Sequence, residues 1–115
     1  MAQLSFGKVT VTTAGTIVRA TSTQSDPTAR VGLQSIQFQA LPANTGVIYI
    51  GTSAMVKSTG VGVLGIIPAP TSATAGPFGS FSVAEVLAPA GLNLADFYID
   101  STVNGEGVII SAVVQ

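Results

Sequence analysis

The chain has 115 residues, of which 47% are hydrophobic and 8% are charged, against roughly 25% charged residues in an average soluble domain. Four Lys and Arg against five Asp and Glu give a net charge of −1, so no strong positive field is available to attract nucleic acid or an anionic membrane surface. Cys and His are absent, which removes disulfides, thiolate nucleophiles, an imidazole base and the usual zinc ligands. We therefore expect a non-enzymatic protein with no metal or cofactor, and with neither nucleic acid nor membrane as a partner.

The first eight residues contain no basic segment followed by an apolar run, so a cleaved secretion signal is not expected and the protein is predicted to fold in a cytoplasm. The longest uncharged stretch lies between Lys57 and Glu85 and contains Pro68, Pro70 and Pro77. Prolines at this density exclude a membrane-spanning helix.

An alternation of apolar and polar residues dominates the chain and is typical of half-buried β-strands. In chain order, it predicts strands at 8–13, 16–20, 35–41, 47–50, 78–86, 97–99 and 108–114. Ala14-Gly15 favours a tight hairpin between the first two strands, and Asn104-Gly105 favours another between the last two, because Asn-Gly supplies the left-handed positions of a type I′ turn. Helix signals are weak by comparison, with a single turn expected at 92–96.

Turn residues recur at intervals of about 8 to 15 positions, as in antiparallel sandwiches rather than βαβ folds. The predicted fold class is therefore all-β: an antiparallel β-sandwich of seven or eight strands, of which the jelly roll is one form. The alternation predicts a core formed by Ile36, Phe38, Ile48, Ile50, Phe81, Phe97, Ile99 and Ile109.

The length predicts one domain over residues 1–115. Residues 1–6 are expected to form an extended arm. Residues 59–78 are rich in Gly, Pro and Ala and are expected to form a long loop, in which 61–67 is compatible with one irregular strand. Loops longer than about 12 residues usually carry function or contact a partner.

Acidic residues near the end of the chain are the first candidates for chemistry. Asp96, Asp100 and Glu106, with Asn104 between them, supply oxygen ligands of the kind that Ca²⁺ binds. They lack the alternate-residue rhythm of a calcium loop, and nothing in the sequence places two carboxylates across an aromatic groove as in a glycosidase. We therefore interpret these residues as parts of solvated turns, and we expect no catalytic site.

Three motifs together resemble a group of small virion proteins of tailed bacteriophages. They are Asn44-Thr45-Gly46-Val47-Ile48-Tyr49-Ile50-Gly51, then Tyr98-Ile99-Asp100, then Asn104-Gly105-Glu106-Gly107. The resemblance covers about a third of the chain, chiefly residues 36–53 and 94–114. The chain departs from the group at 61–79, where an insertion rich in Ala, Pro and Gly stands in place of a short turn. The resemblance implies a β-sandwich structural subunit that decorates or cements a capsid.

From these observations we expect a structural virion protein that binds the outer surface of a bacteriophage head and stabilises it. The major capsid protein or another virion protein is the expected partner, together with further copies of this chain, most simply as a trimer because icosahedral shells offer three-fold positions. The expected contact residues come from the arm and the long loop: Leu4, Phe6, Val61, Leu64, Ile66, Ile67 and Phe78. A tail, baseplate or head-fibre component and a carbohydrate-binding or surface-binding module are the alternatives. A neutral, soluble monomer covered by Ser, Thr, Gln and Asn is the simplest competing interpretation of the composition.

Overall fold

The computed structural model describes residues 2–20, 33–69, 79–84 and 94–114. The strands are β1 (Ala2–Val11), β2 (Val18–Arg19), β3 (Leu33–Ala40), β4 (Ile48–Val56), β5 (Val61–Ile67), β6 (Ser80–Ala84), β7 (Tyr98–Ser101) and β8 (Glu106–Val114). A 3-10 turn, η2 (Leu94–Asp96), leads into β7 and confirms the turn predicted there. Nowhere in these ranges does a helix have the length and apolarity needed to cross a membrane.

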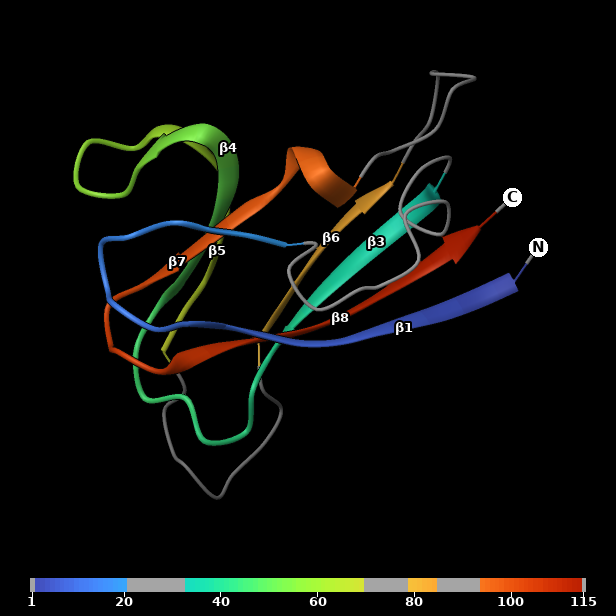
Figure 1. Ribbon diagram of the computed structural model, residues 1–115, viewed down its shortest axis with the longest axis horizontal. Coiled ribbons are helices and arrows are strands. Elements are labelled where there is room, and N and C mark those ends of the chain that lie inside the picture. The colour runs from blue at the N-terminus through green and yellow to red at the C-terminus, as the bar shows by residue number, and fades with distance from the viewer. Residues whose placement is uncertain (1, 21–32, 70–78, 85–93, 115) are drawn as a thin grey trace.

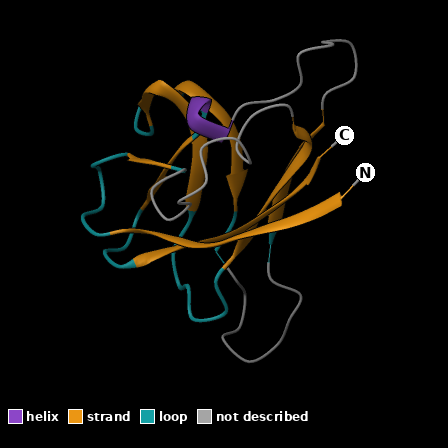
Figure 2. Cartoon of the chain, turned by 45° about the vertical axis from the view of Figure 1, so that its right-hand side comes forward, coloured by secondary structure: helices purple, strands orange, loops and turns teal. Residues whose placement is uncertain are grey.

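The strands form two antiparallel sheets that pack face to face (Figures 1 and 2), with the strand orders β1-β8-β3-β6 and β2-β7-β4-β5. Pairing is nested along the chain: β4 pairs with β5, β3 with β6, β2 with β7 and β1 with β8. A long hairpin rolled up in this way is the topology of the jelly roll. The predicted antiparallel β-sandwich is confirmed.

Both predicted hairpins at Gly-containing turns are wrong. The strand before Ala14-Gly15, β1, pairs with β8, whereas the strand after it, β2, pairs with β7 in the other sheet. In the same way, Asn104-Gly105 connects β7 of one sheet to β8 of the other. A tight turn reverses the chain but does not choose the strand's partner, and in a sandwich the chain can cross from one sheet to the other at such a turn. Among the described strands, the consecutive pair that forms a hairpin is β4 and β5.

The core lies between the two sheets and is formed by alternate residues of their strands. The predicted core residues Ile36, Phe38, Ile48, Ile50, Phe97 and Ile99 are all buried. Phe81 is partly buried, and its ring centroid lies 6.3 Å from that of Phe38. The ring centroid of Phe97 lies 5.8 Å from that of Phe38.

The prediction for Ile109 is wrong, because its side chain is 38% exposed. Residues 108–114 are almost all apolar, so the sequence shows no alternation that distinguishes the inner face from the outer. The structure resolves this, since Val108, Ile110 and Ala112 of β8 face the core.

The predicted arm and loop also differ from the structure. Residues 2–6 belong to β1, whose pairing with β8 begins at Ala2 opposite Val114. The predicted loop contains a regular strand, β5, over 61–67, while residues 70–78 lie outside the described part of the chain. Glycine permits this strand at Gly65, because an added Cβ there would meet the Phe81 ring at 2.4 Å.

Candidate interaction surface

Exposed apolar side chains gather on the β4–β5 hairpin. Six large hydrophobic side chains are exposed in the described ranges, and four of them are on this hairpin: Val56 (46%), Val61 (58%), Leu64 (52%) and Ile66 (54%). We call these four residues the β4–β5 patch. The other two, Val103 and Ile109, lie elsewhere in the fold.

The β4–β5 patch includes the outermost strand of its sheet. In the strand order, β5 stands at the end of the sheet and has β4 as its neighbour there. Leu64 is the extra residue of a β-bulge, since Gly65 and Val63 pair with the consecutive residues Ile50 and Gly51. Proteins often protect an edge strand with a charged side chain or a proline, but β5 carries neither between Val61 and Ile67.

Charge is absent from the patch itself. Lys57 is the single charged residue between positions 48 and 67, and its Nζ lies 3.4 Å from Oδ2 of Asp100 on β7. An uncharged apolar strand at the end of a sheet is a surface that proteins usually cover with another chain.

The structure brings together only part of the predicted contact set. Val61, Leu64 and Ile66 lie in the patch, whereas Phe6 is 4% exposed and Ile67 is fully buried, so both are core residues and the prediction for them is wrong. Ile67 faces inward because it pairs with Ile48, itself a core residue. Leu4 lies in β1 opposite Ala112. Phe78 lies outside the described residues.

Sequence alternation does not find Val56, because it ends the strand at residue 50 and the next four residues, 51–54, are glycine, polar or small. The register explains its position: between the pairs Gly51–Val63 and Val56–Val61, β4 has four intervening residues and β5 has one. This bulge carries Val56 to the exposed end of the hairpin, opposite Val61. No pattern of two-residue period could have revealed it.

Two of the motifs that carry the resemblance contact each other in space. Oε2 of Glu106 accepts hydrogen bonds from the backbone N–H (2.6 Å) and the hydroxyl (2.9 Å) of Thr45, and Oε1 accepts one from the N–H of Gly46 (2.8 Å). The buried Asn44 side chain donates to the carbonyl of Gly107 at 2.8 Å and accepts from its N–H at 3.3 Å. These contacts join the loop before β4 to the start of β8.

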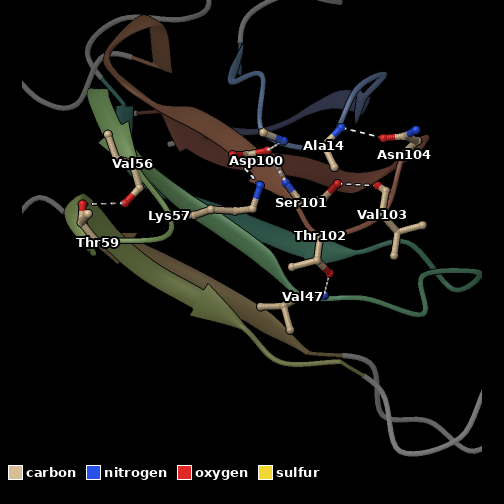
Figure 3. Close-up of polar contacts among 11 residues, drawn as sticks. Ala14, Val47, Val56, Lys57, Thr59, Asp100, Ser101, Thr102, Val103 and Asn104 are labelled. Carbon is tan, nitrogen blue, oxygen red and sulfur yellow. Dashed lines mark hydrogen bonds and ion pairs between the residues drawn. The ribbon is translucent and has the colours of Figure 1, made fainter.

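The third motif supplies Asp100, which fastens the connection between β1 and β2 (Figure 3). Its Oδ1 accepts from the N–H of Gly15 at 2.9 Å and from the N–H of Ser101 at 2.8 Å, while Lys57 extends toward Oδ2. Asp100 is 3% exposed, so its interpretation as a solvated-turn residue is wrong. An open pocket of about 220 Å³ adjoins this pair and is lined by Gly15, Met55, Val56, Lys57, Ser58 and Asp100.

The carboxylates do not form a common site. Glu106 is committed to Thr45 and Gly46, Asp100 to Gly15 and Lys57, and Asp96 is exposed in η2. Within the described ranges no three potential metal ligands gather. The motif residues therefore hold connections of the jelly roll together, and the β4–β5 patch is the candidate functional surface.

Comparisons of the chain with protein-family models, with curated proteins and with solved structures return no match.

Proposed function

We propose that this protein is a structural virion subunit that binds the outer surface of a bacteriophage head and stabilises the shell. The observation that carries the proposal is the β4–β5 patch, an uncharged group of half-exposed Val, Leu and Ile side chains on the end strand of a sheet. Burial of such side chains against a second protein is favourable, because each contributes a hydrophobic gain that the isolated chain leaves unrealised.

The motif contacts support the bacteriophage part of the proposal. The residues of the Asn44-Thr45-Gly46 and Asn104-Gly105-Glu106-Gly107 motifs make reciprocal hydrogen bonds, so the resemblance rests on one connected structural unit rather than on separate short matches. Jelly rolls also occur in viral capsid proteins and in lectins. Fold alone does not choose between these two, and the side chains at the surface favour the first.

The aromatic and carboxylate side chains favour the virion protein over a carbohydrate-binding module. Sugar sites commonly combine exposed aromatic rings with free amide and carboxylate groups, whereas this sequence contains no Trp. The hydroxyl of Tyr98 already accepts hydrogen bonds from the Arg19 guanidinium at 2.6 and 3.0 Å, and the carboxylates of Asp100 and Glu106 are occupied within the fold.

Attachment through the patch is expected to depend only weakly on salt concentration. Screening weakens interactions between exposed charges but leaves apolar burial intact or strengthens it. Because the patch has no charged side chain, we expect binding to shells to persist at high ionic strength. Further copies of this chain, in a trimer or another assembly, would bury the same kind of surface.

Mass spectrometry of purified particles tests the proposal. A copy number comparable to that of the major shell protein is expected for a decoration subunit. A copy number far below it would indicate a tail or baseplate component, and absence from particles would refute the proposal. Light scattering on the isolated protein establishes whether the chain already self-associates before it meets a shell.

A further inference from the structure

The turn between β7 and β8 places an asparagine directly before a glycine at the surface. Asn104 and Gly105 are both exposed, and Gly105 has a φ of +82° with no atom within 4 Å of where a Cβ would stand. This conformation is open to glycine and strained for other residues. The sequence therefore places a side-chain amide next to a main-chain nitrogen whose own residue has no side chain to hinder attack.

An Asn-Gly pair can modify itself. The deprotonated main-chain nitrogen of Gly105 attacks Cγ of Asn104, the N–Cγ bond forms, the bond from Cγ to Nδ2 breaks, and ammonia leaves with the proton from the Gly105 amide. The product is a five-membered cyclic imide. Water then adds to one of its two carbonyl groups and opens the ring to aspartate or to isoaspartate, in which the main chain runs through the side-chain carbon.

In the folded protein both reacting groups are held by the end of β1 and the residues that follow it. The Gly105 N–H donates to the carbonyl oxygen of Val11 at 2.7 Å. The carboxamide oxygen of Asn104 accepts from the N–H of Ala14 at 2.7 Å (Figure 3). The hydrogen bond to Val11 favours the protonated form of the Gly105 nitrogen, and the hydrogen bond from Ala14 restricts rotation of the Asn104 carboxamide, so the attack is suppressed while these contacts last.

We propose that Asn104 is a self-modification site whose deamidation is controlled by the docking of residues 11–16, which include Val11 and Ala14, onto the Asn104-Gly105 turn. While the segment is docked, it suppresses the reaction. When the segment is released, the cyclic imide can form. The isoaspartate product adds one methylene to the main chain, which shifts the Gly105 N–H and the side-chain oxygen out of register with Val11 and Ala14. Release followed by isomerisation therefore prevents the segment from docking again.

The structure offers a variant that loosens the docked segment without touching the reacting residues. The Gly15 N–H anchors the segment to Oδ1 of Asp100 at 2.9 Å, and Gly15 has a φ of +93°. Gly15→Ala strains this backbone, while the new Cβ makes only an ordinary contact, with Lys57 Nζ at 3.6 Å. Gly60→Ala is the matched control, because Gly60 has a φ of +81° and open space around it, but lies in the β4–β5 turn.

The experiment follows the gain of about one mass unit on the peptide that contains Asn104, with isoaspartate separated chromatographically, in mildly alkaline buffer with and without denaturing urea. The wild-type chain is expected to react roughly tenfold or more slowly when folded, the ratio for a local opening that costs about 1.4 kcal/mol. Gly15→Ala should accelerate the reaction of the folded chain, Gly60→Ala should not, and Gly105→Ala should slow the reaction in urea.

Equal rates in folded and unfolded wild-type chains would overturn the proposal, as would no reaction in urea. A Gly15→Ala rate equal to that of wild type, or a Gly60→Ala rate raised as much as that of Gly15→Ala, would show that docking of residues 11–16 is not the control. If Gly15→Ala does not fold, the rate of hydrogen exchange of the Gly105 amide in the wild-type protein tests whether this amide is protected by docking. Slow exchange is expected, and exchange at the rate of an open loop would contradict the mechanism.

Discussion

Glu106→Gln tests the contact between the loop before β4 and the start of β8. The side chain keeps its shape, but one of the two oxygens becomes an NH₂ group and the charge is lost. In wild type both oxygens accept, two bonds from Thr45 reaching Oε2 and one from Gly46 reaching Oε1. Whichever way the amide turns, at least one backbone N–H then faces a donor.

The expected loss of unfolding free energy follows from these three hydrogen bonds. A hydrogen bond to a charged group contributes about 1.5 to 3 kcal/mol, and a neutral one about 0.5 to 1.5 kcal/mol. Thr45 is exposed and water can replace part of what it loses, whereas Gly46 is half-buried and Glu106 is 8% exposed. We expect a loss of about 2 to 3 kcal/mol, since one charge-assisted bond disappears and the others weaken.

Urea unfolding followed by far-ultraviolet circular dichroism measures this loss. Asp96→Asn is the control, because it removes the same charge from an exposed carboxylate and is expected to stay within about 0.5 kcal/mol of wild type. Thermal unfolding should show a parallel decrease of roughly 3 to 6 °C per kcal/mol for a domain of this size. A Glu106→Gln variant as stable as Asp96→Asn would refute our view that Glu106 locks the two connections together.

Three further predictions concern packing. Phe38→Ala should cost about 3 to 5 kcal/mol in unfolding free energy, since the ring is fully buried; a loss under about 1 kcal/mol would place it at the surface. Ile67→Ser should destabilise by several kcal/mol while its neighbour Ile66→Ser stays within about 1 kcal/mol, because Ile67 is fully buried and Ile66 is 54% exposed; equal effects would contradict the register of β5. Gly65→Ala should lower the melting temperature, as its Cβ would meet the Phe81 ring at 2.4 Å; an unchanged melting temperature would show that this edge of the sandwich is loose.

The fold class was predictable because several strands have one polar face. In β3, Gln37 and Gln39 separate Ile36, Phe38 and Ala40, and all three of these apolar residues are buried. Where this contrast is lost the prediction fails, as at Ile109.

Strand pairing could not be derived from the turns. Ala14-Gly15 and Asn104-Gly105 have the chemistry of hairpin turns, yet each leads the chain from one sheet to the other. The choice of partner depends on contacts that are distant in sequence, such as that between Ala14 and Asn104. Local turn propensity contains no information about them.

The candidate surface was predictable in part. The absence of charge around Val61, Leu64 and Ile66 indicated this strand as a contact region. It could not distinguish these exposed residues from the buried Ile67. That distinction depends on the bulge at Leu64 and on the pairing of Ile67 with Ile48. The roles of Asp100 and Glu106 were likewise hidden, because their hydrogen-bond donors lie 85 and about 60 positions away in the chain.

Co-sedimentation with particles stripped of this protein tests the β4–β5 patch most directly, with Leu64→Ser/Ile66→Ser compared against Ile109→Ser on the other sheet. All three residues are exposed, so circular dichroism should confirm that both variants fold. The double variant should bind about 30-fold more weakly, since two half-exposed side chains lose roughly 2 kcal/mol of burial, and wild-type binding should persist at high salt. Undiminished binding by the double variant, or wild-type binding that disappears at high salt, would contradict attachment through the patch.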